Sequence, residues 1–353
     1  MATDFVAELC TRVKQAAESG TALRLQGGGT KDFYGNAPRG EVVGMGAYRG
    51  IVAYEPRELV LTVRAGTALA EVESALAAER QMLPFEPPHF GEGAATIGGT
   101  VAAGLSGPRR PYAGSVRDFV LGTRIVNGKG EDLSFGGRVI KNVAGYDVSR
   151  LMAGSMGTLG AITEVSFKVL PRPPAELTLS YPMDEAAAIA QVNAWAGQPL
   201  PLSATAWLGG RLLVRLAGAE SAVRAARAKM GGEEASDLPG FWAALRDQRI
   251  AFFAGDEPLW RVSLPQAAPP LGLSETTLVE WGGGLRWLRG QLDAAAVRSA
   301  AERAGGHATL FRGGERSAGA FHPLAPAVLK IHRRLKAAFD PAGIFNPGRF
   351  YDF

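Results

Sequence analysis

Three segments of the chain combine glycine with small hydroxyl side chains. They read RLQGGGTKDFYG at 24–35, TIGGTVAAGLSGPRRPYAG at 96–114 and GSMGTLGAITEV at 154–165. Because glycine has no Cβ, such a backbone turns freely and lets successive N–H groups converge on an anion. A single GGG is equally compatible with a tight turn after a strand. Together, the three segments predict one long groove that binds a pyrophosphate and an extended cofactor.

The spacing of these residues excludes several other kinds of site. No GK[ST] follows the glycines, so they form no Walker loop, and no GxGxxG marks a strand-to-helix turn. Cys10 is the only cysteine, which rules out a disulfide framework and an iron–sulfur cluster held by this chain alone. The four histidines have no metal-ligand spacing, and we predict no metal site.

Short strands and helices must position the glycine segments. Residues 21–170 carry β-type runs separated by glycine, with a helical pattern in TALAEVESALAAERQ, which predicts an α+β domain. The proline-rich LPRPPAE at 170–176 indicates a boundary, and the β-α-β-β-α order that follows is typical of a ferredoxin-like layer. We therefore predict domains at 1–172 and 173–323. A basic amphipathic helix and a tail that returns to the first domain are expected at 324–353.

The composition is that of a soluble globular protein, with 46% hydrophobic and 20% charged residues among 353. The apolar runs are too short to span a membrane, and the acidic N-terminal segment does not resemble a signal peptide. We therefore expect a cytoplasmic location. The net charge of +4 is spread along the chain without basic blocks interleaved with aromatic residues, which argues against a nucleic-acid partner.

The three glycine segments resemble, in order, the motifs of the PCMH-type FAD-binding domain of the vanillyl-alcohol oxidase superfamily. The similarity covers residues 20–172 and returns at DPAGIFNPGRF, which is similar to the C-terminal signature of the glycolate and D-lactate dehydrogenase branch. This resemblance implies an α+β fold in which two α/β subdomains hold FAD and a smaller ferredoxin-like domain forms a cap.

The resemblance also implies flavin contacts, residue by residue. It assigns the pyrophosphate loop to Gln26, Gly27, Gly28, Gly29, Thr30 and Gly35. It assigns the stretch beside the flavin and its ribityl chain to Thr96, Gly98, Gly99, Ala102, Gly104 and Ser106. Gly160 and Ile162 match the stretch at the isoalloxazine edge. Pro87 is a further candidate, and Asn346 is either a flavin-edge contact or a turn residue before proline.

Within the superfamily, the short length and GYDVSRLMAGSMGTLGAITEVSFKVLPRP resemble the FAD-binding subunit family of bacterial glycolate oxidase. This implies a larger flavin subunit and an iron–sulfur subunit as partners, a small 2-hydroxy acid as substrate, and peripheral association with the inner membrane through the complex. A covalently bound flavin would need a histidine or cysteine in the first or second glycine segment. The first offers Phe33 and Tyr34 instead, and the second offers Arg109 and Tyr112. We therefore predict noncovalent FAD.

No catalytic base is identified from the sequence. Arg109, Arg110, Tyr112, His89 and His322 are candidates for substrate contact by residue type only. Three hypotheses remain open at this point: a flavin subunit of a multi-chain glycolate oxidase, a free-standing FAD oxidoreductase of another small hydroxy acid or alcohol, and a non-enzymatic scaffold. The pyrophosphate loop argues against the scaffold, and the missing metal histidines argue against a self-sufficient D-2-hydroxyacid dehydrogenase.

Overall fold

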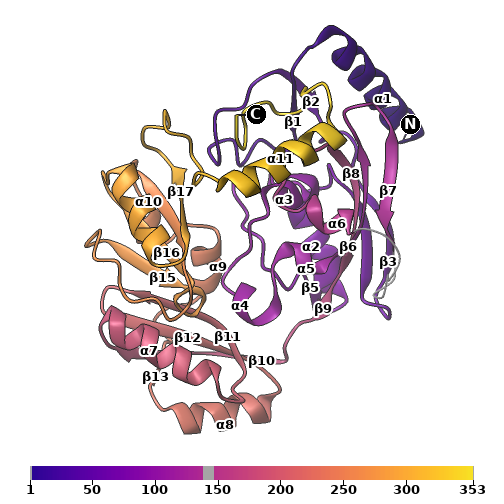
Figure 1. Cartoon of the computed structure of the whole chain (residues 1–353). Helices are drawn as coiled ribbons and strands as arrows, with labels where there is room; N and C mark the ends of the chain where they lie inside the picture. The colour runs from indigo at the N-terminus through magenta and orange to yellow at the C-terminus, as the bar shows by residue number, and fades with distance from the viewer. Residues whose placement is uncertain (1, 138–146, 353) are drawn as a thin grey trace. The chain divides into compact units, whose positions relative to one another are not determined.

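The structure is a computed structural model that describes residues 2–137 and 147–352 (Figure 1). Its described residues fall into two compact units. The first unit comprises 1–105, 115–171 and 323–353, and the second comprises 106–114 and 172–322. These units differ from the predicted domains at 106–114, which we predicted as part of the first domain.

A small α/β layer begins the first unit. Helix α1 (Ala2–Ser19) packs the face formed by Val6, Leu9 and Val13 onto strands β1 (Leu23–Gln26) and β2 (Glu41–Gly44). The two strands are parallel, and Phe345 of the C-terminal tail forms a parallel bridge to Leu23. The tail therefore completes a layer that the first residues of the chain begin.

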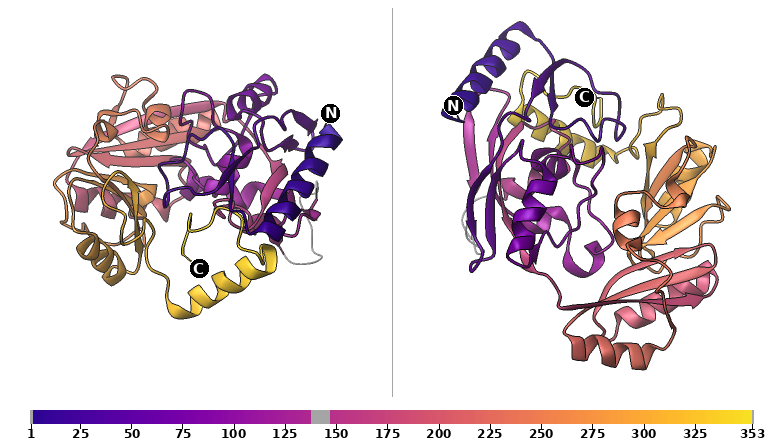
Figure 2. Two further views of the ribbon diagram at one scale, coloured as in Figure 1. Left: turned by 90° about the horizontal axis from the view of Figure 1, so that it is seen from above. Right: turned by 180° about the vertical axis from the view of Figure 1, so that it is seen from behind.

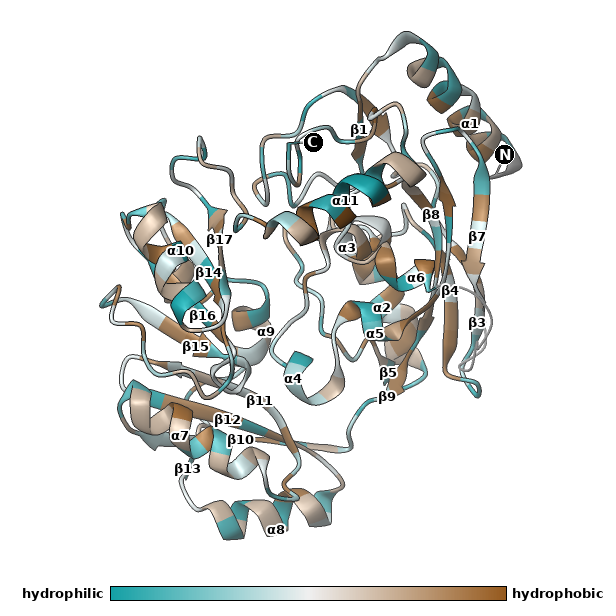
Figure 3. Ribbon diagram, in the orientation of Figure 1, coloured by the Kyte–Doolittle hydropathy of each residue, from teal (hydrophilic) through white to brown (hydrophobic). Residues whose placement is uncertain are grey.

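A five-stranded antiparallel sheet forms the other subdomain of the first unit, in the order β3-β4-β8-β6-β7. Its strands are β3 (Ile51–Glu55), β4 (Val60–Arg64), β6 (Val120–Val126), β7 (Asp132–Gly136) and β8 (Ala161–Lys168). The connections contain α2 (Leu69–Ala78), β5 (Gln81–Met82), α3 (Ile97–Ala103), α5 (Val116–Phe119), α6 (Val148–Leu151) and β9 (Leu170–Pro171). Strands β4 and β8 lie inside the sheet and are mostly buried, and β4 is also mostly apolar (Figure 3).

The chain returns to the first unit after the second unit is complete. Helix α11 (Pro326–Phe339) and the tail behind it lie with the first unit, as the yellow segment in each view of Figure 2. The N–H of Leu23 donates to the carbonyl of Ile344, and the N–H of Gly128 donates to the carbonyl of Phe339. These bonds attach α11 and the tail to both subdomains of the first unit.

The second unit is built on one eight-stranded antiparallel sheet, in the order β13-β10-β12-β11-β15-β16-β14-β17. Its first half contains β10 (Ala175–Pro182), α7 (Glu185–Ala196), β11 (Leu202–Leu208), β12 (Arg211–Gly218), α8 (Glu220–Met230) and β13 (Glu233–Glu234). This βαββαβ succession, with its fourth strand beside its first, is the ferredoxin-like arrangement. The predicted ferredoxin-like cap is confirmed.

The second half of this sheet repeats the same strand order. It contains β14 (Leu259–Ser263), β15 (Thr277–Glu280), β16 (Leu285–Arg289), α10 (Ala294–Arg303) and β17 (His307–Arg312). Residues 264–276 form a loop where the first half has helix α7. The halves join where β11 pairs with β15. Four short helical segments complete the unit: α4 (Arg110–Ala113), α9 (Phe241–Arg246), η1 (Ala251–Phe253) and η2 (Trp281–Gly283).

Candidate functional site: a glycine-lined groove

The three glycine segments meet at one groove in the first unit. Two adjoining parts of the groove share seven lining residues: Leu25, Gly27, Thr96, Gly99, Ala102, Met156 and Asn346. The predicted residues that line one or both parts are Gln26, Gly27, Gly28, Gly29, Thr30, Thr96, Gly98, Gly99, Ala102, Gly160 and Ile162. Segments that are distant in the sequence therefore come together as one candidate binding site.

The GGGT loop starts where strand β1 ends at Gln26. Of its three glycines, Gly29 has a positive φ of +67°, a conformation that favours glycine. Gly28 is required for a different reason, because a Cβ there would lie 1.6 Å from the carbonyl oxygen of Ala94. The loop thus packs its own backbone against a neighbouring backbone, and Gly28 has a structural role beside any contact with a ligand.

The second segment forms helix α3, which is capped by Thr96. The N–H of Gly99 donates to Oγ1 of Thr96 at 3.4 Å. A Cβ at Gly98 would lie 2.7 Å from the Cβ of Ala65, so this glycine lets α3 pack closely on the segment after β4. At Gly99, a Cβ would have only Thr96 Oγ1 within 4 Å, at 3.2 Å. Gly99 therefore leaves space in the groove itself.

The third segment carries the groove to the start of strand β8. Gly157 has a positive φ of +69°. A Cβ added to Gly160 would lie 2.9 Å from the carbonyl oxygen of Val126, which is too close. Ile162 belongs to β8 and is 6% exposed. These residues form an apolar end of the groove with Met45 and Ala65. Such an end suits a flat, largely apolar ring system better than a phosphate.

Two residues of the C-terminal tail join the strands and loops of the groove. Oδ1 of Asn346 accepts a hydrogen bond from the N–H of Leu25 at 2.8 Å, and its Nδ2 donates to the carbonyl of Met156 at 2.7 Å. Arg349 donates to the carbonyls of Asp32 at 3.1 Å and Lys31 at 3.0 Å, and to that of Asn36. The tail therefore holds both the GGGT loop and the third segment in place.

Cationic side chains surround the GGGT end of the groove. Lys31 and Arg349 line it together with Arg24, which pairs with Asp32 at 2.5 Å. Burial lowers the pKa of Lys31 to about 8, and its Nζ lies 5.8 Å from the centre of the Phe90 ring. An anion at this end would favour the protonated form of Lys31. Sequence reasoning missed Lys31 and Arg349, although Lys31 directly follows GGGT.

Several predicted residues lie elsewhere. Gly35, Gly104 and Ser106 are absent from the described lining of the groove. Gly104 instead caps the C-terminus of α3 with a φ of +67°, and a Cβ there would lie 2.8 Å from Cα of Gly154. Ser106 belongs to the second unit, and its predicted flavin contact stays a prediction. Pro87 is buried but is also absent from this lining.

The candidate substrate residues are similarly dispersed. His89 pairs with Glu73 at 2.8 Å in the first unit. Nδ1 of His322 accepts from the N–H of Ala308 on β17 in the second unit. Three others, Arg109, Arg110 and Tyr112, belong to the 106–114 segment of the second unit. Among the described residues, no three His, Cys, Asp or Glu side chains gather as a metal site.

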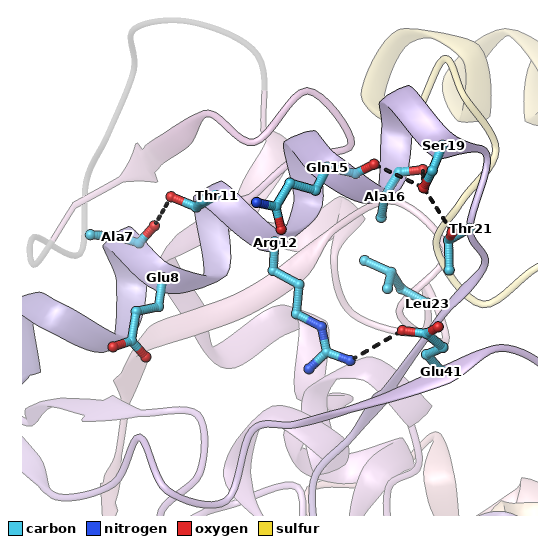
Figure 4. A pocket seen from close by; sticks show the side chains of 10 residues that line it. All are labelled: Ala7, Glu8, Thr11, Arg12, Gln15, Ala16, Ser19, Thr21, Leu23 and Glu41. Carbon is cyan, nitrogen blue, oxygen red and sulfur yellow. Dashed lines mark hydrogen bonds and ion pairs between the residues drawn. The ribbon is translucent and has the colours of Figure 1, made fainter.

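A second hollow lies along α1, with a volume of about 700 Å³ (Figure 4). Arg12 crosses it from the helix to Glu41 at 3.8 Å and donates to the carbonyl of Val42 at 3.0 Å. Ser19 and Thr21 are hydrogen-bonded at its other end. The hollow is broad and open to solvent, and none of the three glycine segments contributes to it. We therefore place the candidate site at the glycine-lined groove.

The residues of the groove fit FAD. The space left by Gly99, the cations at the GGGT end and the apolar end at Ile162 match a linear cofactor with a pyrophosphate and a flat ring. The lining of the groove in the described chain includes no histidine or cysteine that could tether the ring. Among the described residues, no helix is long and apolar enough to cross a membrane.

Comparisons with known proteins agree with this fit. The FAD binding domain family matches residues 4–136, and the C-terminal domain of FAD linked oxidases matches residues 322–350. A solved structure of alkyldihydroxyacetonephosphate synthase resembles 96% of this chain and 75% of its own, with a TM-score of 0.64 and 16% identity. Fold and groove together define an FAD-linked oxidoreductase with a PCMH-type flavin domain.

Sequence similarity identifies the family more closely. Glycolate oxidase subunit GlcE of Escherichia coli is 49% identical over 99% of this chain and 98% of its own length. D-lactate dehydrogenase of Anaerostipes hadrus is 34% identical over 51% of this chain, but over only 36% of its own length. Glycolate oxidase subunit GlcD of Bacillus subtilis is 34% identical over 36% of this chain and 27% of its own. The chain belongs to the GlcE family of glycolate oxidase subunits.

Proposed function

We propose that this chain is the FAD-binding subunit of a glycolate oxidase that converts glycolate to glyoxylate. The observation that carries the proposal is the convergence of three glycine segments and the C-terminal tail on one groove, in a chain that matches a GlcE subunit over almost its whole length. The reaction removes two electrons and two protons from the hydroxyl-bearing carbon and its hydroxyl group. Bound FAD supplies the electron-accepting chemistry.

This chain's own residues would bind and orient the cofactor. The backbone of Gly27 to Thr30, with Lys31, would hold the pyrophosphate. The surface of α3 around Gly99 and Ala102 would follow the ribityl chain, and Gly160 and Ile162 would contact the edge of the ring. Since the described lining has no tethering histidine or cysteine, the flavin would be held noncovalently.

The proposal includes two partner chains, a larger FAD subunit and an iron–sulfur subunit. With one cysteine in the sequence, the chain lacks the thiolates for a cluster, so electrons that reach its flavin need another carrier. The relative named as a GlcD subunit of glycolate oxidase shares 34% identity with 36% of this chain, and its name supports a partner of that kind. We also propose a cytoplasmic location, with contact to the inner membrane only through the complex.

Two other functions compete with this one. A free-standing FAD oxidoreductase of another 2-hydroxy acid would need a complete substrate site and an acceptor of its own. A non-catalytic scaffold would need neither flavin nor the glycines of the groove. The space at Gly99 and the cations at the GGGT end favour a flavoprotein over a scaffold.

One purification distinguishes these functions. The chain alone should be yellow, and acid precipitation should release about one FAD per chain into the supernatant. Alone it should reduce a dye poorly with glycolate, and co-expression with a larger flavin subunit and an iron–sulfur subunit should restore turnover. Colour that remains in the protein pellet would contradict noncovalent binding. Rapid glycolate-dependent dye reduction by the lone chain would favour the free-standing enzyme, and a colourless chain would favour the scaffold.

A further inference from the structure

Helix α11, which belongs to the first unit, has an exposed apolar side. Val328 is 42% exposed and Ile331 is 56% exposed, which makes Ile331 the most exposed large apolar side chain among the described residues. Leu335 follows at helical spacing and is half-buried. Because residues at i, i+3 and i+7 share one face of a helix, these three side chains form a single apolar stripe.

A basic surface adjoins the apolar stripe. Lys330, Arg333 and Arg334 are exposed, and none of them has a hydrogen bond or an ion pair within the part of the chain that the structure describes. Arg334 lies three residues after Ile331 and therefore borders the stripe, and Lys330 lies one turn before Arg334. The helix itself contains no acidic residue. Its exposed side thus combines apolar contact area with unpaired positive charge.

The fold holds α11 through other residues. Lys336 is the buried residue of the helix, and its Nζ donates to the carbonyl of Thr158 in the third glycine segment at 2.8 Å. The ring of Phe339 contacts that of Phe135 on β7, with the ring centres 6.5 Å apart. Neither contact uses Val328, Ile331 or the three cations. The exposed side of α11 is therefore available to another molecule.

The charge on this side favours an anionic surface as that molecule. Lys330 and Arg334 are four residues apart, a spacing at which like charges repel. The helix dipole stabilises cations only in the last turn, where Lys336 stands. Carboxylates opposite Lys330 and Arg334 would offset the repulsion, and contact would remove the apolar stripe from water.

Two other occupants match this side less well. A second copy of the chain in a symmetric dimer would bring one basic surface against another. A helix that lies on a membrane buries residues such as Trp, Phe and Leu. Here the exposed apolar residues are a valine and an isoleucine, and Phe339 packs against Phe135. An acidic protein surface is the best match.

We propose that the exposed side of α11 docks a partner subunit of the oxidase, through a surface of carboxylates beside small apolar residues. This inference rests on the proposed function, because it takes the existence of partner subunits from it. Lys336 ties α11 to the third glycine segment of the groove. Docking on α11 would therefore bring the partner to the unit whose flavin needs an electron carrier.

The FAD-loaded chain is titrated onto the larger flavin subunit and the iron–sulfur subunit, and the dissociation constant is measured at low and at high salt. The affinity of the parent should fall as salt rises. K330E/R334E should weaken assembly about tenfold or more, with K330Q/R334Q intermediate. V328S/I331S should also weaken assembly but keep the salt dependence. R224E/K229E, which reverses two exposed cations of α8, is the matched control and should assemble like the parent.

The outcomes separate this inference from the proposed function. The flavin content and melting temperature of each lone variant are measured first, and they should equal those of the parent. If the complex oxidises glycolate while K330E/R334E and V328S/I331S assemble like the parent, the docking surface is wrong and the proposed function stands. Phosphatidylglycerol vesicles that bind the parent but not K330E/R334E, with assembly unchanged, would assign α11 to a membrane and overturn the inference. A lone chain that oxidises glycolate rapidly and binds neither subunit would contradict the proposed function.

Discussion

The Nζ atom of Lys336 lies 2.6 Å from Oδ2 of Asp340, one turn along at the end of α11. Asp340 is 1% exposed and Lys336 is 9% exposed. The same ammonium group donates to the carbonyls of Thr158 and Phe345, both at 2.8 Å. Asp340 also accepts from the N–H of Phe345 at 2.8 Å. This buried pair therefore attaches the C-terminal tail to the third glycine segment of the groove.

Replacing Lys336 with methionine should destabilise the first unit and release its flavin. The change leaves the Asp340 carboxylate buried without its cation, which costs about 3–5 kcal/mol in comparable pairs. Denaturant unfolding gives the free-energy change, and the absorbance of a desalted sample gives the flavin content. K330M alters an exposed lysine of the same helix and should match the parent. Equal stability of K336M and K330M would show that the pair has no structural role.

Replacing Gly99 with valine should abolish flavin retention while the chain stays folded. The new side chain would occupy the groove, and the one neighbour within 4 Å of its Cβ is Thr96 Oγ1. G28V should lower both flavin content and melting temperature, because its Cβ would collide with the carbonyl of Ala94. G46A is the control, since a Cβ there has open space. Full FAD occupancy in folded G99V would exclude this groove as the flavin site.

FAD affinity should decrease as the pH rises above about 8. Burial lowers the pKa of Lys31 to about 8, so its ammonium group is charged below that pH and becomes neutral above it. Loss of a charge-assisted hydrogen bond to phosphate should weaken binding about tenfold. The dissociation constant is measured on apo-protein from pH 6.5 to 9.5. K31R should stay tight across this range and K31M weak across it. Parallel curves for the parent and K31R would contradict a role for Lys31.

Replacing Asn346 with glycine should loosen the junction between β1 and the third glycine segment. Glycine keeps the φ of +41° without strain, so the variant tests the side chain alone. Two backbone groups, the N–H of Leu25 and the carbonyl of Met156, would lose their partner, at about 1–3 kcal/mol each where buried. Thermal unfolding and flavin content are the measurements. N346D keeps the acceptor for Leu25 but sets a carboxylate oxygen against the carbonyl of Met156, so it should be no more stable than N346G.

The glycine motifs could be predicted from the sequence because their composition is local. Gly27, Gly99 and Gly160 belong to three segments whose residue types already indicate close backbone approach. The βαββα order of the cap was readable for the same reason, since α7 is rich in alanine, which favours a helix, and α8 has an amphipathic pattern. The family resemblance then placed these segments in one flavin domain, and the structure brings them to one groove.

Long-range relationships were not predictable in this way. Arg349 reads as part of a turn, and only the fold shows that it binds carbonyls of the GGGT loop. The second half of the cap sheet consists of strands of only four to six residues, separated by irregular segments. Strands this short carry no sequence periodicity that would identify the second half as a repeat of the first. The placement of 106–114 in the second unit comes from long-range contacts such as the bond from Nε1 of Trp281 to the carbonyl of Gly107, 174 residues earlier.

The bond between Leu25 and Asn346 also has a consequence for the synthesis of the protein. The two residues are 321 positions apart, and the entire second unit is translated between them. The strand before the GGGT loop leaves the ribosome long before the tail that completes its layer. Domains generally fold as they leave the ribosome, but the first unit cannot complete this layer until the C-terminal tail has been translated. We therefore expect stable cofactor loading only after translation is complete, and a prematurely terminated chain to expose an unfinished groove to chaperones and proteases.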